Sequence, residues 1–425
     1  MGLSLSALFL SFGGYVGFSP SPTACVTLPI VEPLTQHAPD RSIFRPPPWF
    51  VTSLLYTGFA ATGIGIVLPG ALLSLLLTRW SLNDQEAGIL FFLFFIGSTT
   101  GAVLSRGSLP RSIARGCLAA TVGAAFLAIA TRTTAFAAIT LYGLGLGIVM
   151  TSTSLLESRR HPATRAAHIT RLNLVWSLGA CFGPWFALRG AAAWGPQSRL
   201  YDIAALFAVT GILVLFCVQH VEATTAPTLG WWKHARSMPA ALLLMVPLAT
   251  GIESAAGGWL AAYSKRSGHT LGIVIGAATC FWGGLLLSRL LQSSRKVAAR
   301  SVRLSLALNP WLIAAGLALL VSTGNLVSNG DPVFNGNQAA ILVAALLIGF
   351  GVGPMYPSLL ALVLERGEGG NAVFVMAGVG AAVFPLLTGL VSGWTGSLRL
   401  GLCVPLAGAL VMAWCGWRTS QAESF

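Results

Sequence analysis

Charge is what this sequence has least of. Only 9% of its 425 residues are Asp, Glu, Lys or Arg, whereas 55% are hydrophobic. Soluble domains carry about a quarter of their residues as charged groups, because water must solvate their surface. The composition therefore excludes an ordinary soluble protein and predicts that a lipid bilayer surrounds the chain.

Acidic residues are scarcer than basic ones, 12 against 25, which gives a net charge of +13. Such an excess can reflect nucleic-acid binding, contact with anionic lipid, or the positive-inside bias of membrane proteins. Here the basic residues are scattered over many short loops and form no basic stripe. That distribution excludes a nucleic-acid partner and favours a membrane protein.

Motifs of catalysis and nucleotide binding are also missing. The sequence has no His-Glu-x-x-His, no Gly-x-Ser-x-Gly and no phosphate-binding loop, so neither an enzyme nor an ATP-driven pump is expected. It has no Cys-x-x-Cys, and most of its seven cysteines lie inside apolar runs, where they act as small buried hydrophobes. We expect no cofactor and no metal.

Long apolar runs are abundant. About 20 apolar residues, each rising about 1.5 Å along a helix, cross a hydrocarbon layer of about 30 Å. Because helices satisfy their own backbone hydrogen bonds in lipid, we expect an all-α polytopic membrane protein with twelve spans. The expected spans are 50–78, 87–105, 113–130, 134–156, 170–190, 200–219, 239–263, 270–291, 304–322, 338–364, 371–392 and 398–417.

The loops between these runs predict the orientation. With the N-terminus in the cytoplasm, the inner side holds 17 Lys and Arg and the outer side 7, and Arg289 is set aside at a helix end. Basic residues concentrate on the cytoplasmic side of membrane proteins. We therefore expect a multi-pass protein of the cell (inner) membrane with both termini in the cytoplasm.

Residues 1–49 precede the first expected span. Residues 2–18 are apolar, but no Lys or Arg precedes them, so they lack the charged start of a signal peptide. We interpret 1–49 as a disordered N-terminal tail or as an over-long translation start. Pro46, Pro47 and Pro48 form a stiff lead into the span.

Three motifs recur at long intervals and in the same order. They are Gly101 to Arg106 with Gly284 to Arg289, Gly143-x-Gly-x-Gly147 with Gly349-x-Gly-x-Gly353, and Gly179-Ala180 with Gly380-Ala381. Together they predict two six-helix halves in the same orientation. We place the halves at 50–220 and 239–417, a cytoplasmic linker at 221–238 and a cytoplasmic tail at 418–425.

These features resemble the major facilitator superfamily, in which Gly-x-x-x-Asp-Arg follows the second helix. Gly101 and Arg106 fit that motif, but Ser105 replaces its aspartate, and Ser288 does so in the second copy. The resemblance implies two parallel six-helix repeats with the substrate between them. The two copies of Gly-x-x-x-Ser-Arg place Arg106 and Arg289 at equivalent helix ends. We therefore expect both to act as gating residues that reach carbonyls or nearby acids such as Glu157 and Glu365.

Within that superfamily the sequence is similar to the fucose/galactose/glucose proton-symporter group. The similar residues are Leu68-Pro69, Trp80 to Gly88, Asn173 with Trp176, Gly251-x-Glu253, Gly257-Gly258-Trp259, Phe281 to Gly284 and Tyr356-Pro357. This similarity implies a monomeric symporter that moves a small-molecule substrate, such as a sugar, with protons.

Glu253 lies near the middle of the seventh expected span. A charged group there costs about 3 kcal/mol unless it is neutral, paired or wetted, so we expect Glu253 to carry the coupled proton. A protonated glutamate bonded to a neighbouring helix is the structural alternative.

The expected substrate-binding residues are aromatic or amide side chains. They are Tyr56, Asn173, Trp176, Trp259, Tyr263, Trp282 and Tyr356. Trp259 and Tyr263 share one helix face, and Gly257-Gly258 is a place where the helix could break and turn them toward a cavity. Ordinary packing is the alternative for Tyr56, Trp176, Trp282 and Tyr356, and a neighbouring helix is the alternative partner of Asn173.

The sequence thus predicts a secondary active transporter of a small polar solute that works by alternating access. An exporter of hydrophobic compounds and a transporter-like sensor remain as alternatives.

Overall fold

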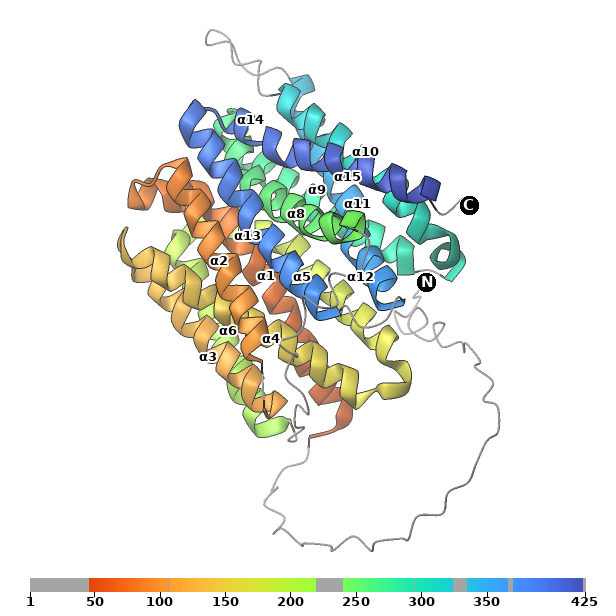
Figure 1. Ribbon diagram of the computed structural model, residues 1–425. Coiled ribbons are helices and arrows are strands. Elements are labelled where there is room, and N and C mark those ends of the chain that lie inside the picture. The colour runs from red at the N-terminus through yellow and green to blue at the C-terminus, as the bar shows by residue number, and fades with distance from the viewer. Residues whose placement is uncertain are drawn as a thin grey trace, which may run out of the picture. The chain divides into compact units, whose positions relative to one another are not determined.

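A computed structural model describes residues 46–105, 107–218, 240–293, 295–323, 335–365 and 370–422 (Figure 1). Every regular element in these ranges is helical, which confirms the all-α prediction. Eleven helices are long and apolar enough to cross a membrane. A twelfth, α5 (Arg165–Trp194), is 30 residues long but less apolar, with Asn173 and Arg189 along it. The tail before residue 46 and the expected linker lie outside the described residues.

The first half is formed by α5 and five other long helices. They are α1 (Pro48–Trp80), α2 (Asp84–Leu104), α3 (Leu109–Ile129), α4 (Thr134–Arg160) and α6 (Pro196–Cys217). The second half contains α8 (Ala240–Arg266), α9 (Leu271–Ser293), α10 (Arg295–Thr323), α11 (Asn335–Val352), α12 (Met355–Glu365), α13 (Gly370–Thr395), α14 (Leu398–Gly401) and α15 (Cys403–Ala422). The expected tenth span is therefore two helices, α11 and α12, which meet at Gly353-Pro354.

Matched close contacts relate the two halves. A Cβ on Gly143 of α4 would meet the Phe94 carbonyl of α2, and one on Gly349 of α11 would meet the Phe281 carbonyl of α9. Glycine lets these backbones touch, as in many membrane bundles. The same relation joins Gly179 to Ala60 and Gly380 to Pro247. These equivalent contacts support the parallel six-helix repeats expected from the sequence.

The repeat in α2 and α9 has a different register from the one that the motifs predict. Gly97 lies against the Thr140 carbonyl, and Gly284 lies against the Leu346 carbonyl. Gly284 is thus the equivalent of Gly97 rather than of Gly101. Moreover, α2 ends at Leu104, whereas α9 continues past Arg289 to Ser293. The expectation that Arg106 and Arg289 occupy equivalent helix ends is therefore wrong, because Arg289 lies one turn inside its helix.

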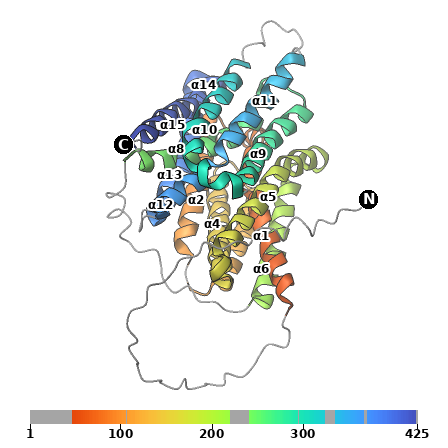
Figure 2. The same cartoon turned by 90° about the vertical axis from the view of Figure 1, so that its right-hand side faces the viewer.

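Three helix pairs join the halves. α2 packs along α13, α5 along α9, and α1 against α8, and the first two pairs lie side by side in both views (Figures 1 and 2). α2 and α9 are the second membrane spans of their halves, and α5 and α13 are the fifth. In both pairs, therefore, the second span of one half packs against the fifth span of the other. This symmetry places α1, α8 and the two equivalent pairs, α2 with α13 and α5 with α9, along the junction between the halves.

α8 is continuous, so the break expected at Gly257-Gly258 is absent. These glycines instead allow close packing, because a Cβ on Gly258 would meet Phe91 of α2 and one on Gly257 would meet Trp282 of α9. α8 is held to α13 at a proline: Pro385 removes the helical hydrogen bond to the Ala381 carbonyl, and Ser254 Oγ donates to that carbonyl at 2.9 Å.

Candidate transport site

Two opposite charges meet in the middle of the second half. Glu253 is in the centre of α8, and its Oε2 lies 3.9 Å from Nη2 of Arg289 on α9. The Glu253 side chain is 17% exposed and the Arg289 side chain 11%. Each charge in such surroundings requires a partner, and we call this partnership the central ion pair. It joins the expected proton carrier to one of the two expected gating residues.

Arg289 also contacts neutral groups on two other helices. Its Nε donates to the Gly353 carbonyl at 3.1 Å, and its Nη1 donates to Ser177 Oγ of α5 at 3.0 Å. The guanidinium lies 5.5 Å from the ring centre of Trp176, a cation–π distance. Because α5 belongs to the first half, Arg289 connects the central ion pair to both halves.

The break between α11 and α12 positions one of these contacts. Pro354 has no N–H, and a residue before proline is disfavoured in the helical conformation, so the helix is interrupted at Gly353. The Gly353 carbonyl is available to Arg289 because its helical donor would be residue 357, which is a proline and has no N–H. Tyr356 lies in the first turn of α12, close to both Glu253 and Arg289. Interrupted helices of this kind form substrate and ion sites in transporters.

Two tryptophans line the same region from opposite halves. The rings of Trp176 and Trp282 are 5.9 Å apart and almost perpendicular. The Trp176 Nε1–H is buried, and among the described residues no acceptor lies within hydrogen-bond reach. Buried donors normally have a partner. The cluster therefore presents an unsatisfied donor beside an arginine at the junction of the halves.

The structure thus brings together five side chains that we call the central cluster: Glu253, Arg289, Trp176, Trp282 and Tyr356. Sequence reasoning named all five, but it missed Ser177 and the Gly353 carbonyl. Pro357, four residues after Gly353, was the available signal that this carbonyl lacks a helical donor.

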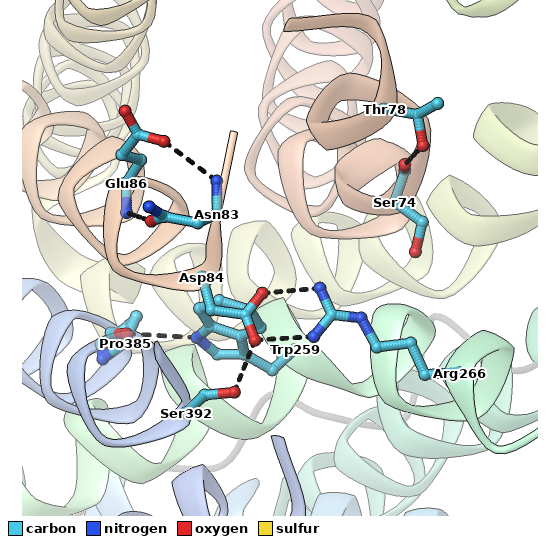
Figure 3. Close-up of polar contacts among 9 residues, drawn as sticks. All are labelled: Ser74, Thr78, Asn83, Asp84, Glu86, Trp259, Arg266, Pro385 and Ser392. Carbon is cyan, nitrogen blue, oxygen red and sulfur yellow. Dashed lines mark hydrogen bonds and ion pairs between the residues drawn. The ribbon is translucent and has the colours of Figure 1, made fainter. Parts of the chain in front are cut away.

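Trp259 and Tyr263 lie elsewhere. The Trp259 indole donates to the Pro385 carbonyl at 3.2 Å (Figure 3), and the Tyr263 hydroxyl donates to the Leu320 carbonyl at 2.8 Å. Both side chains are buried, and with no break in α8 they hold the helices together. The structure therefore does not bring them to the central cluster.

The other expected residues are dispersed. Tyr56 lies 3.3 Å from His168 Nδ1, and Asn173 is exposed. Glu157 pairs with Arg160 rather than with Arg289. Arg106 and the Glu365 side chain lie outside the described residues.

A second ion pair joins the halves where α2 begins and α8 ends. Asp84 Oδ1 and Oδ2 lie 2.6 Å and 2.7 Å from the two Nη atoms of Arg266, and Ser392 of α13 donates to Oδ2 at 2.5 Å (Figure 3). The start of α2 is fixed by a capping box in which Asn83 and Glu86 satisfy each other's backbone N–H groups. We call Asp84, Arg266 and Ser392 the terminal contact. Asp84 belongs to the first-loop resemblance, to which the sequence assigned no role.

The whole arrangement was compared with known families. The model of the Major Facilitator Superfamily matches residues 49–369. The chain belongs to the Major Facilitator Superfamily. It is therefore a transporter of small molecules rather than an enzyme, and its apolar helices are those of a multi-pass membrane protein. No curated protein sequence gives a match.

Solved structures of other transporters share this major facilitator fold. The chain is 12% identical to a mutant of nucleoside transporter NupG, over 87% of this chain and 98% of that one, with a TM-score of 0.68. It is 13% identical to a bacterial homolog of the human lysosomal transporter Spinster, over 88% and 97%, with a TM-score of 0.64. It is also 13% identical to tetrameric PepTSo2, over 87% and 95%, with a TM-score of 0.61. Transporters of this fold bind substrate between the two repeats, and the central cluster lies where α5 of the first half meets α9 of the second.

Proposed function

We propose that this protein is a proton-coupled secondary transporter of a small polar solute. The observation that carries the proposal is the central cluster, in which the Glu253–Arg289 pair and the unsatisfied Trp176 N–H lie where the two halves meet. Alternating access rocks one half against the other around such a site. Groups that touch both halves there can respond to each half's movement.

Proton coupling follows from the chemistry of the central ion pair. A proton on Glu253 removes its attraction for Arg289, because a neutral carboxyl no longer attracts the guanidinium. Arg289 then keeps its contacts with Ser177, the Gly353 carbonyl and the Trp176 ring and can interact with a substrate. Loss of the proton restores the pair and competes with the substrate. One carboxyl thus links proton movement to solute movement.

The polar groups of the cluster fit a hydroxyl-rich solute. Arg289 and Trp176 supply donors, Gly353 supplies an acceptor, and the two tryptophans supply aromatic faces. A sugar uses all of these features, in keeping with the resemblance to the fucose/galactose/glucose symporter group. A nucleoside uses them as well, and the fold-related NupG is a nucleoside transporter.

A cavity favours the second candidate, an exporter of hydrophobic compounds. A space of about 190 Å³ lies near the end of the bundle that carries the terminal contact, and most of its lining is Ala, Leu and Val. Its polar lining residues are Ser74, Lys265 and His269. Burial lowers the pKa of His269, so the neutral ring adds no charge to this wall at neutral pH. An apolar cargo fits this space better than a sugar does.

The remaining parts of the proposal concern topology and gating. We propose that the protein is a monomer in the cell (inner) membrane. Both of its termini are proposed to lie in the cytoplasm. Arg106 and Arg289 are proposed to control the cytoplasmic gate. Ser105, in the position of the motif aspartate, donates to the carbonyls of Gly101 and Ile148, so it fastens α2 to α4.

Reconstitution into liposomes tests the function. Uptake of sugars, nucleosides and apolar dyes is measured with and without an inward proton gradient. Accumulation of a polar solute that requires the gradient supports the proposal. Transport of the dye alone, with no response to any polar solute, favours the exporter instead.

A further inference from the structure

Three metal-ligating side chains converge away from the transport site, around the turn between α4 and α5. They are Glu157 and His161, at the end of α4, and His168 in α5. One ligand atom from each lies within 4.8 Å of the others. The turn brings the two histidines together, because the short helix η2 (Pro162–Thr164) reverses the chain between them.

Two atoms of this cluster are buried without a hydrogen-bond partner among the described residues. They are Glu157 Oε2 and His161 Nε2, which lie 3.8 Å apart. Glu157 is fully buried. Buried polar atoms are rarely left unsatisfied, and these two are both acceptors when the carboxyl is ionised and Nε2 carries no proton. A cation between them satisfies both.

The spacing suits a tetrahedral ion. Zinc holds nitrogen and oxygen ligands at about 2.0–2.1 Å, so neighbouring ligand atoms around it stand roughly 3.3 Å apart. Glu157 Oε2 lies 3.4 Å from His168 Nδ1 and 3.8 Å from His161 Nε2. Modest side-chain movement brings all three atoms to that separation, and His168 Nδ1 exchanges its hydrogen bond with the Tyr56 hydroxyl for the ion. Two imidazoles and one carboxylate are also a ligand set that zinc prefers over calcium or magnesium.

The two imidazole rings must reorient on binding. They are stacked 3.7 Å apart and nearly parallel, so their in-plane lone pairs do not yet point to one position. The His161 side chain is 32% exposed and has room to turn, whereas Glu157 is fixed by Arg160, whose Nη1 contacts the other carboxylate oxygen at 2.5 Å. Arg160 leaves Oε2 for an ion.

We propose that Glu157, His161 and His168 form a binding site for a divalent transition-metal ion such as Zn²⁺. Three protein ligands and one water complete the usual four positions. The ion joins the end of α4 to the beginning of α5, the helix that carries Trp176 and Ser177. This site is separate from the transport site and does not depend on the proposed function.

Metal titration of the purified full-length protein tests the proposal. The protein is prepared without a histidine tag, stripped with chelator, and titrated with Zn²⁺ against a chromophoric competitor. We expect one equivalent to bind, and His161→Ala or His168→Ala to weaken binding by at least about tenfold. His269→Ala is the matched control, because His269 lies in the loop between α8 and α9, and it should leave the affinity unchanged.

Cobalt substitution tests the site in the wild-type protein, so its result does not depend on whether the variants fold. Co²⁺ bound to the wild-type protein should give the intense visible bands of a tetrahedral site, and Zn²⁺ should abolish them. Wild-type protein that binds no Zn²⁺ in competition with the chelator would overturn the proposal. Equal affinities in His161→Ala, His168→Ala and the wild type would do so as well.

Discussion

The central ion pair and the terminal contact are built in opposite ways. Asp84 and Arg266 meet through two short contacts, and the Arg266 side chain is 42% exposed. Glu253 and Arg289 are 3.9 Å apart, and both are mostly buried. The terminal contact crosses from one half to the other with ideal geometry, whereas the central charges lie within one half and are loosely matched.

The difference indicates different tasks. The Arg266 side chain is 42% exposed, although Asp84 is only 12% exposed. Because water competes for the guanidinium, the pair contributes about 1 kcal/mol, and thermal motion can break and remake the terminal contact in each transport cycle. A loosely matched pair in buried surroundings leaves both charges sensitive to a nearby proton or ligand. We infer that the terminal contact closes one end of the bundle and that the central pair responds to what binds.

Removal of Arg289 should show the difference between the central ion pair and the terminal contact most clearly. Arg289→Ala leaves Glu253 buried without its partner, and losing one member of a buried pair costs about 3–5 kcal/mol. We expect transport in liposomes to fall by at least about 100-fold. Arg266→Ala is the control and should retain most activity. Equal losses in both variants would contradict the distinction.

Breaking the terminal contact should change state populations more than chemistry. Asp84→Asn removes a charge worth at most about 1 kcal/mol, so the open population at that end should rise up to about fivefold. The rate at which a maleimide labels Ser74→Cys, in the neighbouring cavity, measures this change. The exchanged pair Asp84→Arg with Arg266→Asp should restore the original rate. An unchanged labelling rate in Asp84→Asn would show that the contact does not hold this end closed.

Two tryptophans provide a smaller and matched comparison. Trp176→Phe removes an N–H that has no partner, so stability should hold while the substrate KM rises roughly three- to fivefold through a lost bond of about 1 kcal/mol. Trp259→Phe removes the bond to Pro385, so it should lower the free energy of unfolding by about 1 kcal/mol and leave KM unchanged. Thermal unfolding and uptake kinetics of both variants check this. The reverse pattern would place Trp259 rather than Trp176 at the substrate.

The N-terminal tail should have the smallest effect. Residues 2–45 contribute no repeated motif and no expected span to the sequence, so their deletion is expected to leave uptake within about twofold of the full chain, a change of under 0.5 kcal/mol. Membrane insertion is measured in parallel. Loss of insertion would show that residues 2–18 are a targeting segment.

Local patterns predicted the helices well. Apolar run length predicted the long helices, because a bilayer imposes that length on each span. The register of α9 was mispredicted because Gly-x-x-x-Ser-Arg matched by letters, whereas backbone packing aligns Gly284 with Gly97. The sequence analysis expected one span where the structure has α11 and α12, although Pro354 marks the break in the sequence.

Partners across helices were harder to predict. Nothing local links Glu253 to Arg289, because their meeting depends on how α8 packs against α9. Helical spacing correctly put Trp259 and Tyr263 on one face, but it could not show that this face packs against α13 and α10. The spacing of Glu157 and His161, one helical turn apart, was a signal for the proposed metal site that the sequence analysis did not use.

Glu253→Gln in liposomes tests the central claim most directly. Glutamine keeps the size of the side chain and resembles its protonated form, so it should still bind solute and exchange it across the membrane. Without a titrating carboxyl the variant should no longer accumulate solute against its gradient when a proton gradient is applied. Exchange without accumulation is the predicted result. A variant that still concentrates solute in response to the proton gradient would contradict the assignment of Glu253 as the coupling carboxyl.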